Sequence, residues 1–212
     1  GQRETTENIT NVLSGMVDVI MARVFENKTV TDLAKYATVP VINGLCDYEH
    51  PTQILGDFLT IYEKYRRFKG LKIAYVGDGN NVCNSTLFGA ALMGTDITAI
   101  TAPGFEPTKD VLDDARNLAE KFDTGAKIEV TNEPKEGIKD ADIVYTDVWA
   151  SMGQEAEADE KKKKFLPYQV DMDKFNLAKP SAIFMHCLPA HYGEEVTHEV
   201  GHCDRSVIFD QA

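Results

Sequence analysis

Residues 186–191, which read His-Cys-Leu-Pro-Ala-His, contain the side chains with the most evident capacity for chemistry. They follow an apolar run at 182–185 that is typical of a buried strand. A thiol beside an imidazole can act as a nucleophile with its base. Adjacent residues of a strand point to opposite faces, however, which makes direct pairing of His186 with Cys187 difficult. A nucleophilic cysteine and a buried structural cysteine therefore both stay open as interpretations.

A second candidate site lies at 50–53, where His-Pro-Thr-Gln begins a long amphipathic run. Proline is favoured in the first turn of a helix, because its missing N–H would have no partner there. The free N–H groups and the positive end of the helix dipole favour a negative or polarised oxygen. His50 and Gln53 add side-chain donors, so this helix start is a candidate anion site. The alternative is that His50 only caps the helix.

A third candidate site lies at 147–153, which reads Asp-Val-Trp-Ala-Ser-Met-Gly. Asp147 ends an apolar run, and Ser151 and Met152 follow it in a predicted loop. Ligands of open α/β sheets bind outside the carboxyl ends of the strands. Asp147 is placed to pair with an ammonium group there, and an ordinary helix cap is the alternative.

A glycine-rich turn at 77–82, Gly-Asp-Gly-Asn-Asn-Val, separates a predicted strand from a predicted helix. Such turns bind anions and dinucleotides. The dinucleotide pattern needs a third glycine where Val82 stands, and an acidic residue at the end of the next strand, where Thr-Ala-Pro stands at 101–103. Both departures argue against a nicotinamide cofactor. The carboxamides of Asn80 and Asn81 favour a small polar ligand instead.

Alternating helices and strands are expected to bring these four runs together. Strands separated by short helices imply βαβ units and a parallel sheet. The helix at 50–67 is predicted to bury Ile54, Leu55, Phe58, Leu59, Ile61, Tyr62 and Tyr65. Helices are expected at 5–16, 29–36, 50–67, 84–93, 107–122 and 133–139, and strands at 17–24, 39–45, 71–76, 97–102, 127–131, 142–149, 182–187 and 206–209.

The composition is that of a globular protein and excludes several classes. Of the 212 residues, 43% are hydrophobic and 26% charged, which argues against a disordered chain. The net charge of −12 repels phosphate backbones, so we expect no nucleic-acid partner. No apolar run approaches the roughly 20 residues of a membrane span, and the start has no signal-peptide pattern. Four cysteines without a Cys-x-x-Cys pair predict a reducing, cytoplasmic setting.

Two further features of the sequence could indicate binding sites, but each has a simpler structural explanation. His198, His202 and Cys203 lie close together and could ligate a metal, but a surface turn is the simpler interpretation. The run at 155–164 is acidic and then basic, with opposite charges four residues apart. It is typical of a solvated helix, and a basic binding patch is the alternative.

Taken together, these runs resemble the ornithine carbamoyltransferases. Residues 50–53 look like that family's carbamoyl phosphate motif, 147–153 like its ornithine loop, and 186–189 like its third signature. The runs at 40–44, 77–81 and 193–197 fit as well, so the resemblance extends over essentially the whole chain. Several motifs in order at matching spacings are far more specific than any one alone.

The resemblance implies an α/β fold in two parts. Residues 1–66 are expected to be the second half of an α/β carbamoyl phosphate domain. Residues 67–212 are expected to be a parallel-sheet, Rossmann-like domain that binds ornithine. The family's Ser-Thr-x-Arg-Thr and Glu-Asn-Arg motifs are not in this sequence, so we expect an internal segment of a longer protein. Tyr192 stands where relatives commonly have Arg.

The activity that the resemblance implies is transfer of a carbamoyl group from carbamoyl phosphate to the δ-amine of L-ornithine, giving L-citrulline and phosphate. It further implies a cytoplasmic homotrimer, or a multiple of one, in arginine metabolism and amino-acid biosynthesis, with no membrane partner. Neither a metal nor an organic cofactor is expected, because the phosphate of the substrate already activates the carbonyl.

Residue roles follow from the same resemblance. Arg23 and His50 would donate to the carbonyl oxygen, and Arg23 would also neutralise phosphate. Gln53 would hold the carbamoyl NH2, the Leu188 carbonyl would accept from it, and Cys187 would also contact this end of the site. The expected carbamoyl phosphate residues are thus Arg23, His50, Gln53, Cys187 and Leu188.

At the other end, Cys187 would contact the δ-amine region, with Asp147 nearby, and help the amine lose its proton. The residues expected to hold the amino-acid part of ornithine are Asn81, Asp147, Ser151 and Met152. The expected catalytic residues are Cys187, Asp147, His50 and Arg23.

Other functions remain as alternatives. A related amine such as putrescine could replace ornithine, or the segment could be inactive alone and serve as a binding or assembly module. A nicotinamide-dependent oxidoreductase is motivated only by Gly77 and Gly79.

Overall fold

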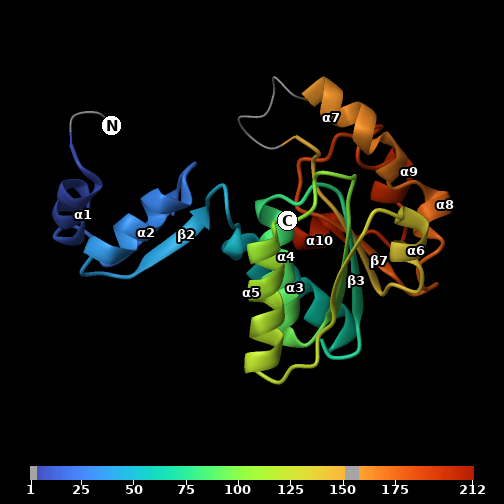
Figure 1. The fold of residues 1–212 in the computed structure, drawn as a ribbon, viewed down its shortest axis with the longest axis horizontal. Coiled ribbons are helices and arrows are strands. Elements are labelled where there is room, and N and C mark those ends of the chain that lie inside the picture. The colour runs from blue at the N-terminus through green and yellow to red at the C-terminus, as the bar shows by residue number, and fades with distance from the viewer. Residues whose placement is uncertain (1–3, 151–157) are drawn as a thin grey trace.

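The computed structural model describes residues 4–150 and 158–212 (Figure 1). The N-terminal segment contains a two-stranded parallel sheet and projects away from the rest of the molecule. Thr5 caps its first helix by accepting from the Asn8 N–H. The elements of this segment are α1 (Thr6–Ser14), β1 (Ile20–Arg23), α2 (Asn27–Tyr36) and β2 (Val41–Leu45).

The larger part of the molecule is built around a five-stranded parallel sheet, as expected from the alternation of strands and helices. Its strand order is β5-β4-β3-β6-β7. The chain starts in the central β3, continues outward on one side and then returns to the other side. The order therefore reverses between β3 and β6, where ligands of open α/β sheets bind. The strands are β3 (Lys72–Val76), β4 (Asp96–Ile100), β5 (Ile128–Thr131), β6 (Ile143–Thr146) and β7 (Ile183–His186).

Helices cover both faces of this sheet (Figure 1). One face carries α3 (Pro51–Tyr65), α4 (Asn81–Met93) and α5 (Lys109–Lys121). The other carries α6 (Pro134–Ile138), α7 (Ala158–Phe165), η2 (Leu166–Tyr168), α8 (Met172–Phe175) and α9 (His198–Gly201). None of the described helices has both the length and the apolar character needed to cross a lipid bilayer.

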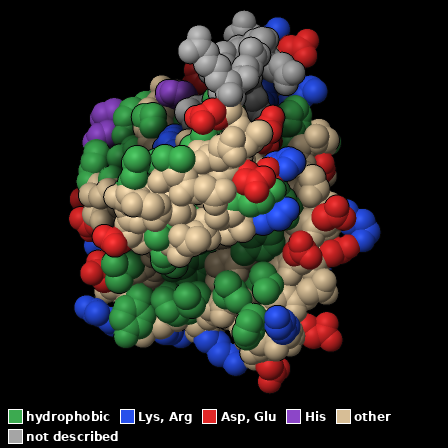
Figure 2. All heavy atoms as spheres, turned by 90° about the vertical axis from the view of Figure 1, so that its left-hand side faces the viewer, with side chains coloured by type: hydrophobic (Ala, Val, Ile, Leu, Met, Phe, Trp, Pro, Cys, Tyr) green, Lys and Arg blue, Asp and Glu red, His purple; other side chains and the backbone are tan. Residues whose placement is uncertain are grey.

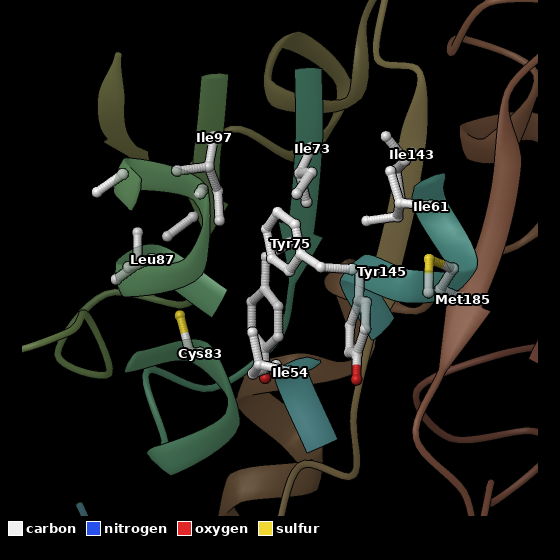
Figure 3. Packing of buried hydrophobic residues seen from close by; sticks show 14 of the residues in the cluster. Ile54, Ile61, Ile73, Tyr75, Cys83, Leu87, Ile97, Ile143, Tyr145 and Met185 are labelled. Carbon is white, nitrogen blue, oxygen red and sulfur yellow. The ribbon is translucent and has the colours of Figure 1, made fainter. Parts of the chain in front are cut away.

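Each strand of the larger sheet supplies side chains to two separate cores. In β3, Ile73 and Tyr75 pack toward α3, α4 and α5, whereas Ala74 and Val76 pack on the opposite face. Strands buried on both faces show this two-residue alternation. Figure 3 shows Tyr75 beside Tyr145 of the neighbouring strand, with both hydroxyls directed to the same end. The two rings stack with centroids 5.6 Å apart.

The prediction of a strand at 206–209 was wrong. Ser206 makes a single bridge to Phe184, after which the chain turns into a short helix, α10 (Ile208–Gln211). A short apolar run cannot be assigned to strand or helix by periodicity alone. The helical turn is stabilised by the Gln211 N–H, which donates to the Val207 carbonyl over 2.9 Å. It directs the Gln211 side chain into the protein, where 7% of the residue is exposed.

The buried face of α3 is narrower than predicted. Ile54, Phe58 and Ile61 are buried, but Leu55 and Leu59 are 69% and 59% exposed, and Tyr62 is also exposed. The seven apolar residues cover more than one face of the helix, and only one stripe packs against α4 and the sheet. The helix predicted at 84–93 begins earlier, at Asn81, because Asn80 caps it by accepting from the Cys83 N–H.

Candidate active site

A cleft of about 830 Å³ opens where the N-terminal segment meets the carboxyl ends of β3, β6 and β7. Seven of the nine predicted site residues line this one cleft. Ser151 and Met152, the other two, lie outside the described residues. The predicted residues that line it are Arg23, His50, Gln53, Asn81, Asp147, Cys187 and Leu188.

Asp147 is the centre of the hydrogen bonds on the sheet side of the cleft. It follows β6 and is buried. One carboxylate oxygen accepts from Asn80 Nδ2 over 2.9 Å, and the other accepts from Cys187 Sγ over 3.1 Å. Asn80 Oδ1 in turn accepts from the Tyr75 hydroxyl and the Cys83 N–H. The amide of Asn80 is thus oriented at both ends and holds the Asp147 carboxylate in place.

Cys187 is a hydrogen-bond donor in this arrangement. Burial raises the pKa of its thiol far above the ordinary value, and the Asp147 carboxylate beside it acts in the same direction. The thiol therefore stays protonated at neutral pH, when a nucleophile would need to be a thiolate. His186 does not serve as its base, because both ring nitrogens have other partners. Nε2 contacts Glu195 at 3.1 Å, and Nδ1 accepts from the Leu188 N–H at 2.9 Å.

The loop after β7 is shaped by these contacts of His186. Leu188 has a positive φ of 55°, a conformation that non-glycine residues seldom adopt without support. The Leu188 N–H is held by His186 Nδ1. Glu195, which is fully buried, accepts from His186 and from the His191 N–H. The backbone beside Cys187 is therefore held rigidly at the rim of the cleft.

His50 and Gln53 face the cleft from the start of α3. The His50 N–H donates to Ser85 Oγ over 2.8 Å, which ties the helix start to α4. Burial lowers the pKa of His50, and the positive charge of Arg23 lowers it further, so the imidazole is neutral near pH 7. Its Nδ1 is buried and has no hydrogen-bond partner among the described residues. Gln53 Nε2 donates to Asp57 over 2.8 Å.

The glycine-rich turn has a structural explanation that needs no dinucleotide. A Cβ atom on Gly79 would lie only 2.4 Å from the backbone nitrogen of Pro107. Glycine is therefore required for the close approach of the 105–107 backbone. Asn81 lines the cleft and donates from Nδ2 to the Cys46 carbonyl over 2.7 Å, so it links the turn to the N-terminal segment.

Lys161 was predicted within a solvated helix, but the structure buries it. Its Nζ lies 2.5 Å from Asp78 Oδ2, and both side chains are at least 90% buried where they line the cleft. Burial raises the pKa of Asp78, while the hydrogen bond from Lys161 opposes that rise. The neighbouring Lys162, Lys163 and Lys164 are exposed, as expected. An ion pair therefore attaches α7 to the glycine-rich turn.

Sequence reasoning assigned Asn80 only to a small polar ligand, and it assigned no functional role to Asp57 or Lys161. Asn80 could have been found as the cap immediately after the turn. Asp57 carries a carboxyl group within the apolar stripe of Ile54, Phe58 and Ile61, which is a sequence signal of a buried polar group. The contact of Lys161 with Asp78 spans 83 residues and has no local signal.

Two groups of possible metal ligands occur in the described part of the chain, each with its ligand atoms within 4.8 Å of one another. One is Asp147, His186 and Cys187, in which both His186 nitrogens already have partners. The other is His191, Glu194 and Glu195. The suggested trio of His198, His202 and Cys203 is not among these groups. The rings of His198 and His202 are exposed and stack 3.9 Å apart on the surface, but they lie on the short helix α9 and its C-cap rather than in a turn.

Comparisons with known proteins match both parts of the chain to one family. Residues 1–63 match the family model "Aspartate/ornithine carbamoyltransferase, carbamoyl-P binding domain", and residues 69–212 match "Aspartate/ornithine carbamoyltransferase, Asp/Orn binding domain". The chain is 53% identical over 210 residues to an anabolic ornithine carbamoyltransferase of Pyrococcus furiosus, covering 99% of this chain and 66% of the relative. It is 54% identical to the ornithine carbamoyltransferase of Thermococcus kodakarensis, with the same coverage.

Solved structures give the same result. The ornithine carbamoyltransferase from Pyrococcus furiosus superposes with a TM-score of 0.94 at 52% identity, covering 99% of this chain and 66% of that one. The ornithine carbamoyltransferase from Thermus thermophilus superposes with a TM-score of 0.87 at 40% identity, covering 100% of this chain and 67% of that one. The chain thus spans about two thirds of the length of these relatives. This chain belongs to the aspartate/ornithine carbamoyltransferase family.

Proposed function

We propose that the protein containing this chain transfers the carbamoyl group of carbamoyl phosphate to the δ-amine of L-ornithine, giving L-citrulline and phosphate. The observation that carries the proposal is the shared cleft. Donors from the start of α3 face a carboxylate, a thiol and carboxamides at the carboxyl edge of one sheet. The relatives named above are called ornithine carbamoyltransferases, and they support the same conclusion.

The carbamoyl phosphate side of the cleft would stabilise negative charge. Arg23 and His50 would donate to the carbonyl oxygen, and Arg23 would also attract the phosphate. A neutral imidazole still offers one N–H, so the lowered pKa of His50 is compatible with donation. Each preorganised donor to a developing oxyanion contributes roughly 3 kcal/mol to catalysis. Gln53 and the Leu188 carbonyl would hold the carbamoyl NH2, beside Cys187.

The ornithine side would bind the attacking amine. The carboxylate of Asp147 attracts the ammonium form, and the Cys187 thiol lies beside it. Once the amine is neutral, its nitrogen bonds to the carbonyl carbon while the bond to the phosphate oxygen breaks. The phosphate leaves and takes up one of the two protons on that nitrogen, and the other proton stays on the citrulline NH group. We assign Asn81, Ser151 and Met152, with Asp147, to the amino-acid end of ornithine.

Organisation and setting complete the proposal. Residues 1–66 would form part of the carbamoyl phosphate domain, and 67–212 the ornithine domain. We propose a cytoplasmic homotrimer, or a multiple of one, that acts in arginine metabolism. One relative is named anabolic and another, from Thermoplasma volcanium, catabolic, so the assay below compares both directions.

The test uses the protein expressed from its complete reading frame. Citrulline formation is measured with ornithine, putrescine and aspartate as acceptors, and phosphorolysis of citrulline is measured in parallel. We expect kcat/KM for ornithine to exceed that for each other amine by at least about 100-fold. Asp147→Asn should lower kcat/KM for ornithine by about 100-fold or more, because it removes the charge that attracts the amine. Preference for putrescine, or full activity of the Asn variant, would refute the assignment.

A further inference from the structure

Behind the cleft, Asp57 is the centre of a buried cluster of hydrogen bonds. It lies on α3 one turn after Gln53, and 2% of it is exposed. Its Oδ1 accepts from Gln53 Nε2 over 2.8 Å and from Gln211 Nε2 over 2.7 Å. Its Oδ2 accepts from the Tyr145 hydroxyl over 2.8 Å. Three donors from three separate elements therefore converge on one carboxyl group.

An ionised carboxylate can only accept hydrogen bonds, and this sets the direction of each partner. Gln53 must turn its NH2 toward Asp57, which leaves Oε1 as the amide atom available to a ligand in the cleft. Gln211 is oriented in the same way, and its Oε1 accepts from the His186 N–H over 2.9 Å. Burial raises the pKa of Asp57 to about 6, so the group is ionised at pH 8.

The surroundings hold the carboxylate itself in position. Tyr145 lies in the core beside Tyr75, as Figure 3 shows, and neither ring is free to move because both are buried. Gln211 is held at its other end by His186. Asp57 is thus restrained by a strand and by α10, while its contact with Gln53 is the one directed to the cleft.

We propose that Asp57 is a positioning residue that orients the Gln53 carboxamide, so that Gln53 presents an oxygen rather than an NH2 group to the carbamoyl NH2. The inference rests on the proposed function, because it assigns a substrate group to that oxygen. Rotating the Gln53 amide by half a turn would place its oxygen against the Asp57 carboxylate and its NH2 group against the carbamoyl NH2. Such a mismatch costs a hydrogen bond and leaves buried polar groups unsatisfied.

The first test replaces Asp57 in the protein expressed from its complete reading frame. Asp57→Asn preserves shape but supplies an NH2 group, so it no longer dictates the direction of its partners. At pH 8 we expect kcat/KM for carbamoyl phosphate to fall by about 10- to 100-fold, and KM for ornithine to change by less than about threefold. The matched control is Thr60→Val. Thr60 is buried on the same helix and its hydroxyl donates to the Gly56 carbonyl, away from the Asp57 cluster, so its loss should leave both constants unchanged.

The second test asks whether Asp57 acts through Gln53. In a Gln53→Leu background, Asp57→Asn should lower kcat/KM by less than about threefold, because the oriented amide is already absent. Fully additive losses would overturn the proposal and indicate a general structural role. If the Asn variant does not fold, Asp57→Ser carries the same expectation, because a hydroxyl can also donate and so imposes no direction.

The two proposals fail in different ways. If the unmodified protein and Thr60→Val both produce no citrulline, the proposed function is wrong. If both are active and Asp57→Asn has unchanged kinetics for carbamoyl phosphate, the positioning role of Asp57 is wrong and the proposed function stands.

Discussion

At the scale of single residues, burial decides which form each group of the site takes. Cys187 keeps its proton and donates to Asp147, whereas His50 loses its charge because it is partly buried beside Arg23. The protonation states of Cys187 and His50 cannot be inferred from their residue types alone. A thiol near an imidazole suggests a nucleophile, yet here the thiol and imidazole bond to different partners. The chemistry assigned to Cys187 follows from that separation.

Replacement of Cys187 separates the donor role from a nucleophilic one. Serine can donate to Asp147 as the thiol does, whereas alanine cannot. We expect Cys187→Ser to retain kcat/KM within about 10-fold, and Cys187→Ala to lose about 10- to 100-fold. Steady-state assays of citrulline formation measure both. Equal and complete loss in the two variants, together with a trapped carbamoylated cysteine in the unmodified protein, would contradict the donor role.

The buried carboxyl group of Asp57 should make stability depend on pH. Its pKa is raised from 3.8 to about 6 on folding, so the folded state holds this proton more tightly than the unfolded state. The contribution is fully present below pH 4 and is lost as the pH rises through about 6, by roughly 3 kcal/mol. The free energy of unfolding of Asp57→Asn, measured with urea between pH 4 and 8, should therefore decline less than that of the unmodified protein. If the two free energies fall in parallel with pH, this expectation is contradicted.

At the scale of elements, the site is assembled from the ends of strands and the starts of helices. The reversal of strand order places the turn after β3 beside the end of β6, which brings Asn80 to Asp147. α10 contributes through Gln211, which connects β7 to α3. Helix α7 is attached to the turn by Lys161 and Asp78. Each link joins segments that are far apart in the chain.

Breaking the buried ion pair should destabilise the attachment of α7. Lys161→Met leaves the Asp78 charge buried without this partner, and we expect unfolding free energy to fall by about 3 kcal/mol. The double variant Lys161→Met/Asp78→Asn should recover much of that loss, since no charge then stays buried. The control is Lys162→Met, whose pair with Glu194 is about half exposed and should contribute less than about 1 kcal/mol. Urea unfolding measures all three, and additive losses in the double variant would contradict the expected coupling.

At the scale of the whole molecule, the N-terminal segment exposes an unusual amount of apolar surface. This side faces the viewer in Figure 2, where hydrophobic side chains form several groups around a centre of other side chains and backbone. Met16 is 74% exposed and Met21 64%. Where exposed apolar side chains of this size gather into a patch, another surface normally covers them. The exposed hydrophobic residues of the segment are Val12, Met16, Val17, Val19, Met21, Phe25 and Ile42.

We therefore expect the 212-residue chain, expressed as such, to associate with itself. Light scattering after size-exclusion chromatography should give a mass above the 23.5 kDa of one chain. The combined variant Met16→Ser/Met21→Ser/Ile42→Ser should shift the distribution toward the monomer. Leu166→Ser, at an exposed leucine on η2, serves as the control and should not. A monomeric unmodified chain would show that this surface is tolerated in water.

The sequence by itself determined the order and kind of most elements. Apolar runs punctuated by glycine and capping residues act locally, and a parallel sheet necessarily brings the ends of its strands to one edge. The sequence alone was therefore enough to predict that Asp147 and Cys187 lie at the same edge of the sheet. The tertiary structure alone decided the burial of Lys161, the hydrogen-bond partners of Asp57 on β6 and α10, the contact of Asn80 with Asp147, and the helical turn at 208–211. These depend on partners up to 154 residues away, and no local pattern encodes such contacts.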